Sequence, residues 1–391
     1  MVDVAVEQLR EESLLSDVVV VEVASEVAGP FTARLLADLG ARCIKIEPSG
    51  GDPTRRWGPF RDDVEDIDAS GAFLVWNHGK ESVVLDLESA EGTTALDALL
   101  AHAQILVEDG RLDVDELRAR FPHLVIVSVT PFGREGWGAG RPATDAVAYA
   151  IGGAMSSTGR PDRPPYHLGG SLIQAFVGSA AATAAMAGLL AAEDGGEGQW
   201  IDVAWVEAEA GSVDRSAPYL LGYIYSGLEA LQEPARARGL PGGSYPCADG
   251  NVVASTYGWT IRRMLDTVGD PELDAVLGES LGNVYRPVGR EVLDRVLPAW
   301  MAARTKEEIT ELAQSKGWAV TPSNTVLEVI DDPFLEEAGA LERVDAGRLG
   351  ELVLPGPAFV TPGGPRFRRR APNLGEHTEI VLAELVPDGV T

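Results

Sequence analysis

The sequence predicts an α/β protein whose larger domain contains a parallel sheet covered by helices and whose second domain is smaller. Short β-branched segments alternate with helical segments through the first half of the chain, and this alternation favours an open parallel sheet. The chain of 391 residues is long enough for two domains. Beyond Leu221 the alternation weakens and glycine and proline become more frequent, so we place a domain boundary near that residue.

The first strand and helix follow from clear local signals. Residues 18–23 form a β-branched run that is typical of a buried parallel strand. A turn at Ala28-Gly29-Pro30 comes next, and proline suits the first turn of a helix. The following leucines share one helical face until Gly40 ends the helix, and residues 42–47 form the next predicted strand. Together these segments make one βαβ unit.

The remaining elements follow from the same periodicities and end signals. Strands are predicted at 82–87, 105–107, 123–129, 200–203 and 251–255, and helices at 89–101, 144–155, 172–192 and after the capping box Thr305-Lys306-Glu307-Glu308. From about Asp331 the chain is β-like and rich in proline, and it ends in an arginine-rich segment and a last helix.

The charge and the cysteine content exclude several classes of function. A formal charge of −28 disfavours nucleic acid and anionic membranes as partners, because the field of the protein repels phosphate. An anionic ligand must therefore meet a local basic cluster. The two cysteines, Cys43 and Cys247, and the scattered histidines show no spacing typical of a disulfide framework or a metal site. We expect no bound metal, a reducing compartment and a cytoplasmic protein.

Two further sequence features bear on membranes and nucleotides. Residues 175–192 carry no charge over nearly the length that spans a bilayer, but they are mostly small. We interpret them as a buried helix and not as a membrane span. The sequence contains no GxGxxG and no GxxxxGK[ST] motif, which disfavours a classical dinucleotide or ATP site. The glycine-rich stretch 133–140 is interpreted as a loop.

Short motifs occur in a fixed order along the chain. They are Ala28-Gly29-Pro30, residues 35–41 (LLADLGA), 44–48 (IKIEP) and 51–53 (GDP), residues 77–82 (NHGKES), Arg141-Pro142-Ala143 with Asp145, Gly198-Gln199 with Asp202-Val203, and residues 245–250, 354–357 and 374–378. In these motifs the chain resembles the family III CoA-transferases, which include formyl-CoA:oxalate CoA-transferase, the carnitine CoA-transferases and the related α-methylacyl-CoA racemases. The resemblance covers nearly the whole chain.

The resemblance implies the family III CoA-transferase fold. In this fold a large Rossmann-like domain and a smaller α/β domain form an open ring, and two protomers interlock as a dimer. We therefore expect residues 1–220 to form the large domain, residues 221–330 to form the small domain, and residues 331–391 to return to the large domain. The expected substrate is coenzyme A, as an acyl-CoA, with no covalently bound cofactor.

The catalytic residue of the family is an aspartate that lies just before the long helix rich in alanine and glycine. Counted back from Gly198-Gln199, the matching position is Gln174. A neutral amide is a poor nucleophile and cannot form the acyl anhydride, so we expect Gln174 to be inactive. Thr144 stands where the racemases carry a histidine, which disfavours racemase chemistry. Asp145 is an alternative catalytic carboxylate.

The CoA-binding residues implied by the resemblance come from the matching motifs. They are Ala28, Gly29, Pro30, Lys45, Arg55, Asn77 and Lys80. The basic residues among them, with Arg56, either contact CoA phosphates or pair with neighbouring carboxylates. Active members also carry a Glu-Asn-Phe-x-Pro-Gly loop after the third strand, whereas residues 107–113 are short and lack it. Arg111 in this segment is a partial substitute.

Three hypotheses about function follow. In the first, the chain is a catalytically silent subunit of a heteromeric CoA-transferase, as in succinyl-CoA:benzylsuccinate CoA-transferase, and its homologous partner carries the aspartate. In the second, it is an active homodimer, either a transferase or another acyl-CoA enzyme, that uses a different catalytic residue such as Asp145 or a carboxylate from the small domain. In the third, it is a non-enzymatic protein that binds acyl-CoA or has a regulatory role.

Overall fold

The computed structural model describes residues 13–160, 162–212, 216–227, 241–278, 282–283, 286–357 and 369–385. The chain divides into two units. The large unit comprises Met1–Met155, His167–Leu221 and Phe334–Thr391, and the small unit comprises Ser156–Tyr166 and Gly222–Pro333. The sequence-based division placed its breaks after residues 220 and 330, and it did not assign the segment 156–166 to the small domain.

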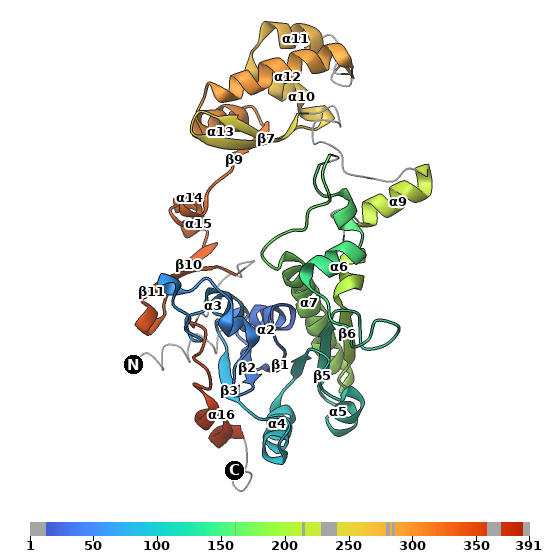
Figure 1. Cartoon of the computed structure of the whole chain (residues 1–391), viewed down its shortest axis with the longest axis vertical. Coiled ribbons are helices and arrows are strands. Elements are labelled where there is room, and N and C mark those ends of the chain that lie inside the picture. The colour runs from blue at the N-terminus through green and yellow to red at the C-terminus, as the bar shows by residue number, and fades with distance from the viewer. Residues whose placement is uncertain are drawn as a thin grey trace. The chain divides into compact units, whose positions relative to one another are not determined.

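A six-stranded parallel sheet forms the centre of the large unit, with the order β3-β2-β1-β4-β5-β6 (Figure 1). The strands are β1 (Val19–Val23), β2 (Arg42–Glu47), β3 (Glu81–Val84), β4 (Ile105–Glu108), β5 (Val125–Thr130) and β6 (Trp200–Ala204). The order reverses between β1 and β4, and ligands of such sheets bind in the crevice outside the carboxyl ends of the strands at this switch point. The predicted α/β fold with an open parallel sheet is confirmed.

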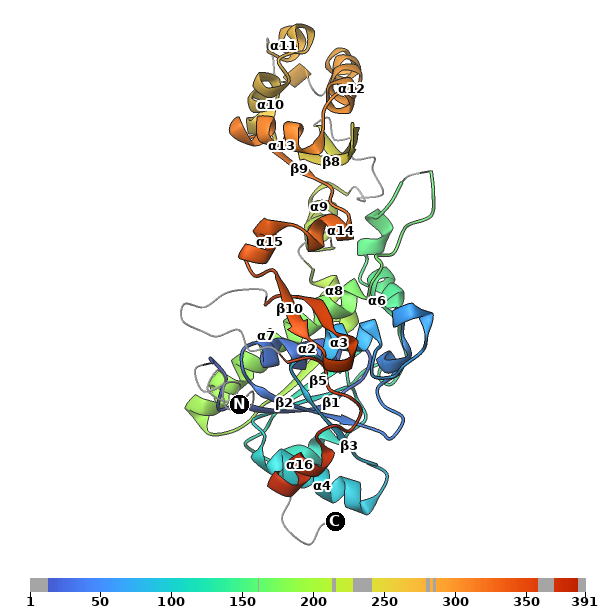
Figure 2. The ribbon, with the colours of Figure 1, turned by 90° about the vertical axis from the view of Figure 1, so that its left-hand side faces the viewer.

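Helices cover both faces of this sheet. One layer contains α2 (Ala28–Asp38), α6 (Asp145–Ile151), α7 (Leu172–Gly195) and α8 (Trp205–Ala210), and the other contains α4 (Ala90–His102), α5 (Val114–Arg120) and α16 (Thr378–Leu385). Val20 of β1 packs into the first layer and Val21 into the second, so both faces of the strand are buried. This explains why the strands are apolar at consecutive positions. Figure 2 shows the late helix α16 beside α4.

Some element ends differ from the prediction for local reasons. Strand β3 stops at Val84, three residues early, because Asp86 begins a turn in which its carbonyl accepts from the Ser89 N–H at 3.0 Å. Helix α6 stops at Ile151 because Gly153 adopts a φ of 93°. That conformation suits glycine and ends helices.

The small unit is built around an antiparallel sheet with its own core. Its strands are β7 (Gly242–Cys247), β8 (Gly250–Ser255) and β9 (Ala319–Pro322), and its helices include α10 (Ile261–Val268), α11 (Pro271–Gly278), α12 (Pro287–Ala302) and α13 (Lys306–Ser315). The predicted capping box is present, since Thr305 and Glu308 exchange hydrogen bonds at 2.9 and 3.2 Å. The small unit also contains α14 (Val326–Ile330). The chain passes between the units within α9 (Ser216–Ser226) and within α15 (Pro333–Glu337), and the hairpin of β10 (Leu341–Asp345) and β11 (Glu351–Pro355) belongs to the large unit.

Helix α7 has the length and hydropathy of a membrane span, and among the described helices it is the one that does. In the structure it packs on α2 and on β5, with Val177, Ala181 and Ala185 buried. Gly178 allows this close approach, because a Cβ at that position would lie 2.8 Å from the carbonyl oxygen of Ala28. The tight contact holds the first turn of α7 beside the first turn of α2.

Candidate functional site

The loops after β1 and β4 meet at the switch point of the sheet. Ser25, after β1, donates from its backbone N–H and its hydroxyl to Oδ2 of Asp109, after β4, at 3.0 and 2.9 Å. Arg111 donates to the same carboxylate through Nε at 2.7 Å and to Ser25 Oγ at 2.9 Å. These bonds fix the wall of a crevice at the carboxyl edge of the sheet.

Ala28, Gln174 and Asp145, which the sequence singles out separately, lie together beside this wall. The Ala28 N–H, in the first turn of α2, donates to Oε1 of Gln174 at 3.3 Å. Gln174 is 4% exposed, and its own N–H donates to Oδ1 of Asp145 at 2.9 Å. Gly29 and Pro30 complete the first turn of α2 and are buried. Residue 174 is thus held between two helix N-termini.

This arrangement suits recognition of an oxygen atom with partial or full negative charge. N–H groups in the first turn of a helix have no partner within the helix, and they stabilise anionic or carbonyl oxygens. In this chain the Gln174 amide oxygen occupies the position in front of Ala28. Gln174 carries no ionisable oxygen, and the carboxylate of Asp145 is engaged by the first turn of α7. Gln174 therefore cannot act as a nucleophile, and one of the two carboxylate oxygens of Asp145 is occupied.

Lys45 and Lys80 lie in a buried cluster below the turn from β1 to α2. Lys45 Nζ contacts Glu22 Oε1 at 2.6 Å, Asp52 Oδ2 at 2.8 Å and the Ala24 carbonyl oxygen at 2.8 Å. Lys80 Nζ contacts Glu22 Oε2 at 2.6 Å, the Pro30 carbonyl oxygen at 2.8 Å and Asn77 Oδ1 at 2.8 Å. The side chains of both lysines and of Glu22 are 0% exposed.

The pKa values of the two lysines shift in opposite directions. Burial lowers the pKa of Lys80 to about 8, since Glu22 offsets burial only in part and the nearby ammonium of Lys45 adds to the shift. Burial also acts to lower the pKa of Lys45, but three carboxylates, led by Asp52, outweigh it and the pKa is raised. Lys80 keeps its proton at pH 7, because a neutral amine would leave one of its three acceptors without a donor.

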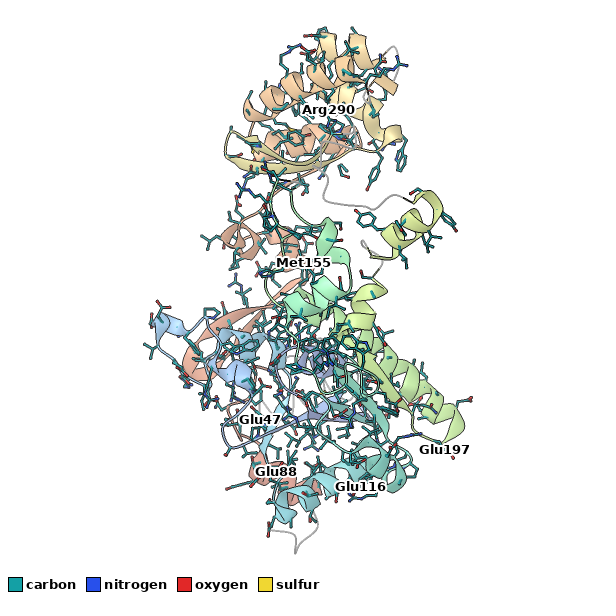
Figure 3. The ribbon with its side chains drawn as sticks, turned by 45° about the vertical axis from the view of Figure 1, so that its right-hand side comes forward. Glu47, Glu88, Glu116, Met155, Glu197 and Arg290 are labelled. Atoms are coloured by element: carbon teal, nitrogen blue, oxygen red, sulfur yellow. The ribbon has the colours of Figure 1, made fainter. Side chains whose placement is uncertain are left out.

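Arg55 forms a second buried cluster. Its guanidinium binds both oxygens of Glu47, at 2.7 and 2.8 Å, and also Asp68 at 3.0 Å (Glu47 is labelled in Figure 3). It donates further to the carbonyl oxygens of Ile67 and Pro372 at 3.2 Å each, and it lies 3.6 Å from the ring centroid of Phe73. Arg55 therefore connects the C-terminal segment to the loop after β2.

The placement of these basic residues favours the ion-pairing alternative for Lys45, Lys80 and Arg55. Each pairs with carboxylates inside the protein, so a phosphate would have to displace a carboxylate to bind. Arg56 differs, because it is exposed and donates to the Gly50 carbonyl oxygen at 2.9 Å. A role of any of the four in CoA binding stays a prediction.

A pocket of about 620 Å³ opens beside the crevice wall. It lies over the carboxyl ends of β4 and β5, and its basic lining residues are Arg111, Arg134 and Arg141. Arg111 is bound to Asp109 but 46% exposed, whereas Arg134 donates to the Leu112 carbonyl oxygen at 2.6 Å. Asp109 and Glu108 offset part of this positive charge, since Arg111 pairs with Asp109 and Arg134 lies 3.5 Å from Glu108. The exposed guanidinium groups of Arg111 and Arg141 still give the pocket the local basic surface that an anionic ligand of this acidic chain requires.

An exposed tryptophan lies next to this pocket, and the sequence did not identify it as a site residue. Trp137 is 72% exposed, and the guanidinium of Arg141 lies 4.9 Å from its ring centroid. Phe132, which lines the pocket, also lies beside Trp137, with 5.6 Å between the two ring centroids. The sequence of the stretch 133–140 indicates only a loop, because a single aromatic residue in a turn has no periodicity to reveal it.

Glu26 is the second residue that sequence reasoning missed. It lies in the turn between β1 and α2 with a φ of 65°, a conformation uncommon for a residue with a side chain. Its carboxylate is half-buried and forms no hydrogen bond or ion pair with other residues in the described part of the chain. Burial, and then the charges of Asp52 and Asp109, raise the pKa of Glu26. Carboxylates with a raised pKa on a strained backbone concentrate at functional sites.

No cluster of three or more potential metal ligands occurs among the residues that the structure describes. The candidate site is therefore composed of helix N-termini, carboxylates and arginines around the switch point. It combines the Ala28 N–H directed at the side chain of residue 174, the carboxylate of Glu26, and a pocket lined by arginines.

Comparison with known proteins gives a consistent result. A family model described as CoA-transferase family III matches residues 15–378. The chain is 30% identical to succinate--glutarate CoA-transferase of Agrobacterium fabrum, over 95% of both sequences. It is 32% identical to the BbsE subunit of succinyl-CoA:(R)-benzylsuccinate CoA-transferase of Thauera aromatica, over 93% of this chain and 92% of the relative. A CAIB/BAIF family protein from Brucella suis has a similar structure, with a TM-score of 0.81 and 27% identity over 94% of this chain and 98% of the other.

Proposed function

The chain belongs to CoA-transferase family III, and from this premise we propose that it is a subunit of an enzyme that moves CoA from an acyl-CoA donor to a carboxylic acid. We further propose that it does not carry out the covalent step itself. The observation that supports this is Gln174, which the sequence count matches to the family's nucleophile position. Gln174 is buried, and its amide oxygen accepts from the Ala28 N–H. A homologous partner subunit with an aspartate at that position would perform the chemistry.

The proposal that this chain does not carry out the covalent step follows from the chemistry of CoA transfer. Transfer of CoA between acids proceeds through attack of an enzyme carboxylate on the thioester carbonyl, which releases CoA thiolate and leaves a mixed anhydride. The thiolate then attacks the enzyme acyl group, and the second acid later takes the CoA. An amide such as that of Gln174 cannot accept and return an acyl group in this way. Asp145 differs from the family's nucleophile in that one of its carboxylate oxygens accepts from the Gln174 N–H.

The arginine-lined pocket is the proposed site for the nucleotide part of CoA. Arg111 and Arg141 would bind phosphate, and the exposed indole of Trp137 offers a surface on which the adenine ring can stack. This pocket lies where the family's longer loop is shortened in this chain. The acyl end would then extend along the crevice toward residue 174.

The partner is proposed from the relatives and from the expected architecture. One of the relatives is by its name a subunit, which supports a heteromer of two similar chains that interlock as rings. A homodimer of this chain is the alternative. Both relatives act, by their names, on dicarboxylic acids, so dicarboxylates are the first acceptors to test. We place the protein in the cytoplasm, with acyl-CoA as substrate and no covalently bound cofactor.

Native mass spectrometry of the protein purified gently from its own organism tests this proposal. The expected result is a complex with a homologue of similar size that carries an aspartate at the position matching Gln174. Turnover of succinyl-CoA with a dicarboxylate should then require both chains. A homodimer that is active alone would contradict the silent-subunit proposal.

The nucleotide pocket yields a binding prediction. Substitution Arg141→Met should weaken CoA binding about tenfold, since a charge-assisted hydrogen bond contributes roughly 1.5–3 kcal/mol. Binding should also weaken as salt rises. Isothermal titration with CoA measures both effects, and Arg262→Met serves as control because Arg262 is an exposed arginine paired with Asp274 in the small unit. Equal affinity of the Arg141 variant and the wild type would place the nucleotide elsewhere.

Glu26 favours a second candidate function, an active homodimer in which Glu26 is the nucleophile. Its carboxylate would attack the thioester carbon, the C–S bond would break, and CoA would leave as thiolate. Thiolate attack on the resulting anhydride would release the first acid and leave a Glu26 thioester, which the acceptor carboxylate opens by the same steps in reverse. Its unpaired state and its place at the switch point support this candidate.

The second candidate predicts covalent labelling. The purified chain alone, incubated with succinyl-CoA and reduced with borohydride, should carry a modification on the peptide containing Glu26. Substitution Glu26→Gln should abolish that label and lower turnover at least a thousandfold, whereas Gln174→Ala should retain both. A chain that neither turns over nor takes up label excludes Glu26 as nucleophile and leaves the heteromer as the proposed function.

A further inference from the structure

Two of the four lysines in this chain are fully buried. Burial of an ammonium group is costly, and it is offset only when the group is paired and all its donors are used. Lys45 and Lys80 share a single carboxylate, that of Glu22, which accepts from both at 2.6 Å. The resulting Lys45–Glu22–Lys80 clamp is therefore a specific device and not a solvated charge pair.

Both ammonium groups of the clamp are surrounded by oxygen atoms of the protein. An ammonium has three N–H donors. Lys80 donates to Glu22, Asn77 and the Pro30 carbonyl oxygen. Lys45 donates to Glu22 and the Ala24 carbonyl oxygen, and it forms an ion pair with Asp52 in which Nζ and Oδ2 are 2.8 Å apart. A phosphate group would have to displace one of these oxygens to reach either lysine, because both side chains are fully buried. Their function must lie in what they hold.

What they hold is the turn that leads into α2. The Ala24 carbonyl lies four residues before Ala28 and the Pro30 carbonyl two residues after it, and each is fixed by one lysine at 2.8 Å. Between them, the Ala28 N–H donates to Oε1 of Gln174. The segment is also closely packed within itself, because a Cβ on Gly29 would lie 2.4 Å from that of Ala24.

We infer that Lys45 and Lys80, joined by Glu22, are positioning residues that fix the segment 24–30 and thereby aim the Ala28 N–H at residue 174. That the Ala28 N–H donates to an acyl oxygen rests on the proposed function, but the positioning of the segment 24–30 by the two lysines does not. In a silent subunit the clamp keeps the α2 turn in place for the Gln174 amide. In a chain with a carboxylate at that position it would hold the donor for the acyl intermediate.

Hydrogen exchange of the full chain tests this inference without any partner or activity. In Lys80→Met, amides of the segment 24–31 should exchange at least tenfold faster than in the wild type, while amides of α7 from 179 to 189 change little. CoA affinity should change less than twofold, because the lysine does not contact phosphate. Lys316→Met is the matched control, since Lys316 is exposed at the end of α13.

A second measurement uses the wild-type protein, in case Lys80→Met does not fold. Lysine-selective carbon and nitrogen labelling gives four side-chain signals, one for each lysine. Lys80 should titrate near pH 8, and the titratable groups that influence it are Glu22 of β1 and Lys45 and Cys43 of β2. Amide exchange in the segment 24–31 should accelerate over the same pH interval, after correction for the intrinsic exchange rates.

The outcomes separate the possible roles. Unchanged exchange in 24–31 together with a large, salt-dependent loss of CoA affinity would make Lys80 a phosphate ligand and overturn the inference. A lysine that titrates without any change of exchange in 24–31 would also overturn it. If the chain proves not to bind acyl-CoA, the proposed function fails, whereas the exchange result for the clamp still stands.

Discussion

Replacement of Glu22 by glutamine is expected to lower the free energy of unfolding by about 3–5 kcal/mol, the usual cost of removing one partner from a buried ion pair. Glu22 is completely buried and is the one carboxylate that binds both Lys45 and Lys80. Lys45 keeps Asp52, but Lys80 keeps only neutral acceptors, namely Asn77 and a backbone carbonyl. The variant leaves a buried ammonium without a countercharge, so the loss is large despite the near-identical shape of glutamine.

Urea unfolding followed by circular dichroism measures this loss, and Glu26→Gln is the matched control. Burial, and then Asp52 and Asp109, raise the pKa of Glu26, so the folded protein holds the proton of this carboxyl more tightly than the unfolded chain does. Near pH 7 the ionised Glu26 therefore opposes folding, and this contribution disappears as the pH falls through its raised pKa. Stability of the Glu26 variant should equal or exceed that of the wild type. Similar losses in both variants would falsify the distinction between a paired and an unpaired glutamate.

Much of the fold was predictable because it depends on local patterns. The run 18–23 is apolar at nearly every position because β1 lies inside a parallel sheet with helices on both faces. The predicted strand at 42–47 coincides with β2, and the capping box at Thr305 begins α13 as expected. Periodicity and capping act over a few residues, so one sequence is enough to recognise them.

The partners of charged residues were not predictable in the same way. Lys45 and Lys80 belong to motifs that suggested phosphate contacts, yet the sequence is equally compatible with ion pairing inside the protein. The decision depends on Glu22, which lies 23 residues before Lys45 and 58 before Lys80. Only the pairing of β1 with β2, and of β2 with β3, brings these three residues together.

The position of Gln174 lies between these two cases. Its match to the family's nucleophile position is a prediction from a count without gaps back from Gly198-Gln199, most of which runs along α7. Its neighbours did not follow from the count. The contact of Gln174 with Ala28 spans 146 residues, and it depends on the close approach of α2 and α7 at Gly178. Glu26 and Trp137 were overlooked because a single charged or aromatic residue in a turn has no periodicity to reveal it.

Substitution Arg55→Met should lower the free energy of unfolding by about 3–5 kcal/mol, whereas Arg56→Met should change it by less than about 0.5 kcal/mol. The two arginines are adjacent and were predicted together as phosphate contacts. In the structure all five N–H donors of Arg55 are used, on Glu47, Asp68 and two backbone carbonyls, while Arg56 is exposed with one bond to a carbonyl. The loss for Arg55 is large because Glu47 would keep a buried charge without its main partner.

Urea unfolding of both variants, with CoA titration of each folded protein, separates structure from binding. Arg55→Lys should recover only part of the lost stability, because an ammonium cannot bind both oxygens of Glu47 in parallel while reaching Asp68 and Pro372. If Arg55→Met is stable but binds CoA more weakly, Arg55 contacts a CoA phosphate and the structural role assigned to it is wrong. If Arg55→Met is less stable and only Arg56→Met binds CoA more weakly, the two adjacent arginines have different roles. Arg55 then holds the C-terminal segment, and Arg56 is available to bind a ligand.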